Sequence, residues 1–242
     1  MKTFIIILLS IIGLSLIFIS FSPDLTLPYQ LNEFRIGPVG DVGVNKANIR
    51  DYLLSYDFEK QEGELKFRYW NGYNKDYRIY ISVPKQVYII DPPNLTLSNI
   101  YQVPLPLGKK EYCSIINNKS EYSNYLDCQF KNISWNESII FNIRLKSFEE
   151  KIYPNGRFVL VNDIKDSTGS DNYISGDRNA IAKFDLGNKY RCSEPCWVND
   201  YIGYNSNENI NYYLENNVLK IYVVPGSNNK ISSNSQFRLN TH

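Results

Sequence analysis

Apolar and polar residues alternate with a period of two over most of the chain, and this pattern constrains the fold more than any other feature. Leucine and aromatic residues alternate with lysine and arginine in residues 65–70, and residues 77–83 and 139–146 show the same alternation. Successive side chains of a β-strand point to opposite faces of a sheet, so this pattern is typical of half-buried strands. Beyond residue 22, helical periodicity is limited to a weak run at 44–54. The sequence predicts a mainly β protein.

Facing apolar residues predict how some of these strands pair. A five-residue loop after residue 70 places Tyr69 opposite Tyr77, which keeps the apolar side chains of both strands on one face. A later hairpin with its turn at 216–217 places Leu214 opposite Leu219. Both turn residues are asparagines, which tolerate the positive φ angles of a tight hairpin turn.

The strand count predicts an architecture. About seven or eight strands in residues 46–150 match an antiparallel immunoglobulin-like or fibronectin-like β-sandwich. Residues 151–225 form either a second β lobe or a continuation of the sandwich. The proline- and glycine-containing residues 23–45 predict a stalk or a first edge strand, and residues 226–242 predict a polar tail.

Residues 1–22 form a segment of different composition. The apolar run from Phe4 to Phe21 (residues 4–21) would form a helix about 27 Å long. That length is close to the thickness of about 30 Å of the hydrocarbon core of a membrane. Lys2 precedes the run and the next basic residue is Arg35, so the positive-inside rule places the N-terminus in the cytoplasm and the ectodomain outside. The segment is expected to be a retained membrane anchor, and the alternative is a cleaved signal peptide of a secreted protein.

Four cysteines suit an exported chain with two disulfides. A hairpin centred on the polar stretch between Cys113 and Cys128 places these two residues opposite each other. Closing a ring of about 15 residues stabilises a fold by ~3 kcal/mol in the chain-entropy model. Cys192 and Cys196 would close a smaller ring. A Cys₄ zinc site is the alternative, although the spacing of the first pair does not fit it.

The sequence contains no recognisable catalytic or cofactor-binding motif. The only histidine is His242, the last residue, and a solvated terminal imidazole does not provide the oriented base of a nucleophilic triad. The acidic residues of the polar loop 162–179 are expected to be solvated, with a calcium site as the alternative. We therefore expect no enzymatic activity and no resident metal or cofactor.

Four sequons suit an exported surface and provide candidate N-glycosylation sites. Their asparagines are Asn94, Asn118, Asn132 and Asn136. Chance alone would produce about three sequons in a chain with this much asparagine, serine and threonine.

Charge and aromatic content narrow the choice of partners. The chain has 26 Lys and Arg against 25 Asp and Glu, so it lacks the basic excess that holds nucleic acid. Its 20 tyrosines, with Trp70, Trp135 and Trp197, indicate carbohydrate stacking if they are exposed and ordinary strand packing if they are buried.

These observations predict a single-pass, membrane-anchored extracytoplasmic protein. Its β-sandwich is expected to bind a protein partner or neighbouring subunit at the cell surface, or to have a structural role there. Two alternatives belong to other classes: an accessory subunit of a membrane protein complex, and a secreted carbohydrate-binding or carbohydrate-active protein.

Overall fold

A computed structural model describes most of the chain. The described residues are 27–39, 47–71, 75–99, 104–105, 111–118, 121–160, 164–165, 180–199, 210–223, 230–231 and 236–242. Their regular secondary structure is entirely β, which confirms a mainly β protein. The expected anchor and most of the polar loop lie outside these residues. No helix in the described ranges has the length and apolar character needed to span a membrane.

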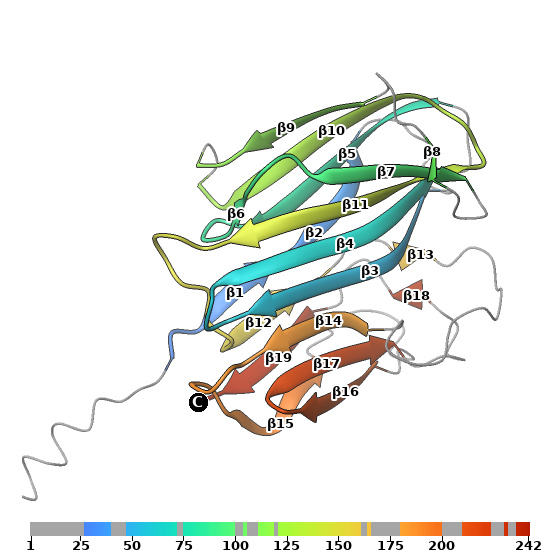
Figure 1. The fold of residues 1–242 in the computed structure, drawn as a ribbon. Helices are drawn as coiled ribbons and strands as arrows, with labels where there is room; N and C mark the ends of the chain where they lie inside the picture. Colours follow the sequence, from blue (N-terminus) through green and yellow to red (C-terminus); the bar gives the residue numbers. More distant parts are fainter. Residues whose placement is uncertain are drawn as a thin grey trace, which may run out of the picture.

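The largest sheet has nine strands in the order β16-β17-β14-β3-β4-β11-β7-β8, with β6 pairing to β11 (Figure 1). Its strands are β3 (Ala47–Asp57), β4 (Glu62–Asn71), β6 (Tyr88–Ile89), β7 (Asn94–Asn99), β8 (Pro104–Leu105), β11 (Glu137–Lys146), β14 (Ala180–Asp185), β16 (Ile210–Glu215) and β17 (Val218–Val223).

Two four-stranded sheets and one short strand pair complete the described fold. The first four-stranded sheet has the order β2 (Arg35–Val39), β5 (Lys75–Pro84), β10 (Ser123–Ile133) and β9 (Glu111–Ile116). The second has the order β1 (Gln30–Glu33), β12 (Gly156–Val159), β19 (Gln236–Thr241) and β15 (Cys192–Asn199). The short pair is β13 (Ile164–Lys165) with β18 (Lys230–Ile231).

Aromatic side chains join both four-stranded sheets to the nine-stranded sheet. Phe130 of β10 meets Phe141 of β11 edge to face, with ring centroids 5.8 Å apart. The rings of Phe158 of β12 and Phe184 of β14 have their centroids 4.9 Å apart. All four residues belong to one buried hydrophobic cluster. Inward residues from all three larger sheets therefore share one core between packed sheets, which is the arrangement of a β-sandwich.

The prediction that residues 65–69 and 77–81 pair as a hairpin is wrong. β4 pairs with β3 and β11, whereas β5 pairs with β2 and β10 in another sheet. The chain changes sheets after Asn71. Both strands bury alternate residues in the shared core, from opposite sides, so the alternation that predicted pairing is equally satisfied by packing face to face.

The other two predicted hairpins match the structure. Cys113 faces Cys128 across β9 and β10, and Leu214 faces Leu219 across β16 and β17. The turn of the second hairpin has positive φ at both asparagines, 50° and 61°. These pairings are local, so facing apolar residues and turn chemistry suffice to define them.

The segments into which the fold is divided differ in part from those expected from the sequence. β14 pairs in parallel with β3, and β17 and β16 follow β14 in the nine-stranded sheet, whereas β12 and β15 lie in the second four-stranded sheet. These five strands of residues 151–225 thus join sheets that also contain β1 or β3. Within the expected stalk 23–45, β1 and β2 are edge strands of the two smaller sheets. The weak helical run at 44–54 lies largely in β3, because strand pairing and burial outweigh a weak local preference.

The expected polar tail 226–242 also contains regular structure. Its last strand, β19, lies between β12 and β15, and Leu239 is fully buried. Leu239 alternates with the polar Arg238 and Asn240, and β19 has a strand partner on each side, so this short stretch forms a strand within the sheet.

Candidate functional site

The four cysteines form two disulfides in two different sheets. Cys113–Cys128 joins β9 to β10, with Cα atoms 4.1 Å apart, and Cys192–Cys196 lies within β15, with Cα atoms 5.1 Å apart. The pairs are those expected from the sequence. Because each pair belongs to its own sheet, the four sulfur atoms do not form the Cys₄ zinc site considered as the alternative.

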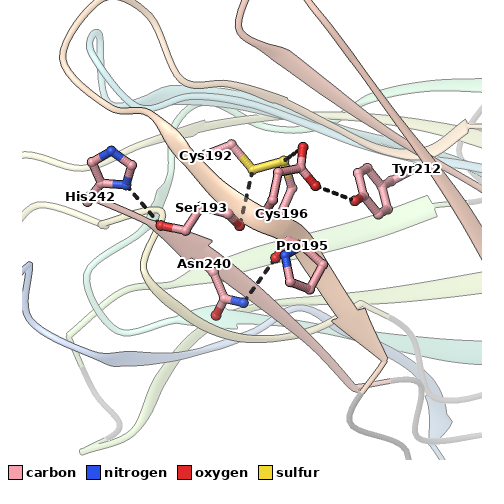
Figure 2. The surroundings of a disulfide bond; sticks show 8 residues. Cys192, Ser193, Pro195, Cys196, Tyr212, Asn240 and His242 are labelled. Carbon is pink, nitrogen blue, oxygen red and sulfur yellow. Dashed lines mark hydrogen bonds between the residues drawn. A yellow bond between two sulfur atoms is a disulfide. The ribbon is translucent and has the colours of Figure 1, made fainter.

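The second disulfide closes a bulge beside the C-terminal strand (Figure 2). Cys192 faces Thr241 and Trp197 faces Leu239, so five positions of β15 span two positions of β19. Two hydrogen bonds hold adjacent residues in the middle of this bulge. Asn240 donates its side-chain amide to the Pro195 carbonyl (3.1 Å), and the Tyr212 hydroxyl donates to Glu194 Oε2 (3.2 Å).

His242 is exposed, as expected for the terminal residue, but both its backbone and its side chain have hydrogen-bond partners. Its backbone exchanges two hydrogen bonds with Arg191, at 2.9 and 3.0 Å. Its Nδ1 atom lies 2.9 Å from the Ser193 hydroxyl (Figure 2). Among the described residues no carboxylate contacts the imidazole, so the pair lacks the orienting group of a catalytic triad. The position of His242 is set by strand β19, which directly precedes it. The sequence did not predict this strand.

The four sequon asparagines lie at separate places on the surface. Asn94 begins β7 and is exposed, Asn118 follows β9, and Asn132 is an exposed residue near the end of β10. Asn136 is half-buried in the turn between β10 and β11. The Asn118 side chain accepts a hydrogen bond from the Tyr88 hydroxyl (3.0 Å). Glycosylation of these residues stays a prediction.

Of the three tryptophans, only Trp135 has a described side chain. It is 55% exposed in the turn that joins β10 to β11. The side chains of Trp70 and Trp197 lie outside the described residues. In the described ranges no three His, Cys, Asp or Glu side chains converge as a metal site would require.

Tyrosines gather on the outer face of the sheet β2-β5-β10-β9. We call this surface the tyrosine face and define it by Arg78 and Tyr80 of β5, Tyr112 of β9, and Tyr125, Asp127 and Gln129 of β10. Intervening residues of the same strands, such as Ile79, Leu126 and Cys128, are fully buried. Alternation along each strand therefore directs the tyrosine-face side chains away from the core.

Strand register brings these side chains together. Tyr80 lies opposite Asp127, and Gln129 lies opposite Tyr112. The Tyr80 and Tyr125 rings pack with centroids 4.7 Å apart, while Tyr112 is 65% exposed. The face thus presents aromatic rings and hydrogen-bonding groups side by side on a sheet surface.

An ion pair holds the centre of the tyrosine face. Arg78 donates from Nε to Asp127 Oδ1 at 2.6 Å and from Nη2 to Asp127 Oδ2. These hydrogen bonds raise the pKa of Arg78. Burial, followed by the nearby Tyr125 and Asp127, raises the pKa of Tyr80. The arrangement can stack on a flat apolar surface and bond hydroxyls at its rim.

A sequence signal for this face existed. Tyr80 occupies the polar phase of its strand, between Arg78 and Ser82, and Tyr125 precedes Asp127 with the same spacing. A tyrosine in the polar phase of an alternating strand faces outward. What the sequence could not supply was the pairing of β5 with β10, which places the two rings in contact.

No protein-family description matches the chain, and no curated protein matches it. Solved structures similar to the chain include two of a family 3a carbohydrate-binding module and one of a protein from Legionella pneumophila. The family 3a carbohydrate-binding module, with flanking linkers, from the scaffoldin CipA of the Clostridium thermocellum cellulosome is 8% identical, with a TM-score of 0.28, and the match covers 45% of this chain and 71% of that chain.

The second structure is the family 3a module from the same scaffolding protein, at 8% identity and a TM-score of 0.27, covering 42% of this chain and 75% of that chain. The third is a candidate nutrient-binding protein from Legionella pneumophila, at 12% identity and a TM-score of 0.37, covering 86% of this chain and 71% of that chain. All three TM-scores are low, so we base no functional argument on these similarities.

Proposed function

We propose that this protein is a non-catalytic, membrane-anchored extracytoplasmic binding protein whose tyrosine face binds a carbohydrate chain. The observation that carries the proposal is the exposed ring of Tyr112 and the half-buried rings of Tyr80 and Tyr125 beside hydrogen-bonding groups on an outer sheet face. The ring faces of a sugar carry apolar C–H groups, and its rim carries hydroxyls. A surface of tyrosines with Arg78 and Gln129 complements both kinds of group.

Two further features support an extracytoplasmic location. The apolar run 4–21 has the length of a membrane-spanning helix. Both cysteine pairs are oxidised, and disulfides persist mainly in oxidising compartments. A cleaved signal would give the same location for a secreted form.

Retention on insoluble polysaccharide tests the binding proposal. The full chain in detergent would be mixed with cellulose, chitin and peptidoglycan sacculi, and the bound fraction measured for the wild type and for Tyr80→Ala and Tyr112→Ala. We expect one polymer to retain the wild type, and each variant to bind about tenfold more weakly, equivalent to ~1.4 kcal/mol. Tyr213→Ala is the matched control, because Tyr213 is 56% exposed on β16, outside the tyrosine face.

Wild-type levels of retention in both variants, or no retention on any of the three polymers, would refute the proposal. Release of soluble sugar from the retained polymer would contradict the non-catalytic part of it.

Cell fractionation tests the location. We expect the protein to stay in the membrane fraction after a high-salt wash, to require detergent for extraction, and to be cleaved by protease added to intact cells. Recovery from the cytosol with four free thiols would exclude the proposed location.

A further inference from the structure

The outer face of the nine-stranded sheet carries a groove that the proposed function does not use. The groove has a volume of about 340 Å³ and is open on one side, and it lies across β3, β4, β11 and β7. That volume is near the lower end for small-molecule sites. We call it the outer groove and define it by its polar side chains: Asp51, Lys66, Arg68, Asn94, Thr96 and Asn142.

Strand register accounts for this set of side chains. Asn142 lies opposite Lys66 on one side and opposite Asn94 on the other. Ile140, the neighbouring outward residue of β11, lies between Arg68 and Thr96 in the same way. The outer groove is thus two adjacent rows of cross-strand neighbours.

A bulge in β3 forms one wall. Between Arg50 and Leu53, β3 contains one more residue than β4 does, and Asp51 adopts a φ of 52°. Bulges redirect side chains, and here the Asp51 carboxylate reaches Arg68 Nη2 at 2.9 Å. The guanidinium is therefore fixed at the edge of the outer groove, with its side chain only 17% exposed.

Two polar atoms of the outer groove are buried without a hydrogen-bond partner among the residues that the structure describes. They are Arg68 Nε, a donor, and Asn142 Oδ1, an acceptor. Arg68 and Asn142 are diagonal neighbours on adjacent strands, so both side chains can reach one point between them. Buried polar groups in native proteins are nearly always paired, so these two atoms point to a ligand.

We infer that the outer groove binds a small, neutral, polyhydroxylated molecule, such as a single sugar unit. A hydroxyl group accepts one hydrogen bond and donates another, so one hydroxyl satisfies both Arg68 Nε and Asn142 Oδ1. Asn94 and Thr96 provide further groups for neighbouring hydroxyls. The cationic side chains already have anionic partners, Asp51 for Arg68 and Glu64 for Lys66, which favours a neutral ligand over an anion.

The inference does not depend on the tyrosine face, which lies on a different sheet. It also suggests that the Asn94 sequon is poorly suited to glycosylation, because Asn94 and Thr96 both line the outer groove. A glycan attached to Asn94 would compete for the same space.

Calorimetric titration of the full chain in detergent with glucose, galactose, mannose and N-acetylglucosamine tests the inference. We expect at least one sugar to bind the wild type. Arg68→Lys keeps the charge beside Asp51 but removes the Nε donor, and Asn142→Leu removes the amide at similar volume. Each change should weaken binding at least tenfold. Arg144→Lys is the matched control, because Arg144 also faces outward on β11 and pairs with Asp91 at 2.9 Å.

The results separate this site from the tyrosine face. Tyr80→Ala should leave titration of the single sugar unchanged, and Arg68→Lys should leave polysaccharide retention unchanged. No binding of any of the four sugars, or unchanged affinity in a folded Arg68→Lys and a folded Asn142→Leu protein, would overturn the inference. Mass spectrometry that finds a glycan on Asn94 in protein from its native membrane would also overturn it, by giving the outer groove a covalent occupant.

Discussion

Among single residues, Gln61 makes an unusually complete set of buried hydrogen bonds. Its amide donates to the carbonyls of Phe58 (2.7 Å) and Ile152 (2.9 Å) and accepts from the Ile152 N–H (2.7 Å). Gln61 itself is 7% exposed. One side chain thus pairs the backbone of a segment 91 positions away along the chain, at a residue that lies outside the strands.

Replacement of Gln61 by methionine preserves the length of the side chain and removes both its donor and its acceptor. We expect the free energy of unfolding to fall by about 2–3 kcal/mol, because the backbone groups of Ile152 are left buried and unpaired. Urea denaturation would measure the change. Gln30→Met is the control, because Gln30 makes similar hydrogen bonds to the backbone of Lys151 and Tyr153 but is only partly buried. The free energy of unfolding should therefore fall by less in this variant. Equal losses would contradict the role given to burial.

At the scale of elements, the turn between β3 and β4 depends on one carboxylate. Asp57 Oδ1 accepts from the backbone N–H groups of Glu59 and Lys60, at 3.0 and 2.9 Å, and Lys60 Nζ donates to Oδ2 at 2.6 Å. Burial alone raises the pKa of Asp57, but the hydrogen bonds from Lys60 and Glu59 outweigh it and the pKa is lowered.

A lowered pKa in the folded state stabilises the protein above the unfolded pKa, about 3.9, and this stabilisation is lost as the pH falls through the folded value. Asp57→Asn should therefore cost ~1 kcal/mol at pH 7, and the difference from the wild type should shrink below about pH 4. Urea denaturation at several pH values would show this. A difference that does not change with pH would contradict it. Asp91→Asn, which breaks an exposed pair with Arg144, should cost less at neutral pH.

The two disulfides close rings of very different size, with sequence separations of 15 and 4. In the chain-entropy model the larger ring contributes about 3 kcal/mol and the smaller about 2 kcal/mol. We expect Cys113→Ser with Cys128→Ser to destabilise the protein more than Cys192→Ser with Cys196→Ser. Denaturation of both double variants without reductant would measure the order. The reverse order would show that the bulge in β15 depends on its bond for more than ring closure.

At the scale of the whole molecule, one continuous core explains why the late strands do not form a lobe of their own. Phe184 of β14 contacts Phe58 (5.7 Å between centroids) as well as Phe158 (4.9 Å). Phe184, on a late strand of the nine-stranded sheet, is thus packed against Phe58 from the first third of the chain.

This continuity predicts cooperative unfolding. Far-ultraviolet circular dichroism and tryptophan fluorescence should report coincident transitions, as expected for a two-state protein. Phe184→Ala should lower the free energy of unfolding by about 3–5 kcal/mol by leaving a cavity, with the two probes still coincident. Separate transitions for the two probes in the wild type would indicate two independent units.

Side-chain alternation and residue spacing were sufficient to predict the β class, the hairpins around Cys113–Cys128 and Leu214–Leu219, and both cysteine pairs. These features depend on side-chain alternation and on partners close in the chain, so local rules apply to them. Packing in three dimensions was needed to place β4 and β5 in different sheets and β19 between β12 and β15. It was also needed to bring together the side chains of the tyrosine face and of the outer groove. Alternation shows which side of a strand is buried, but a strand's neighbours are chosen by packing among distant segments, and both surfaces lie across such neighbours.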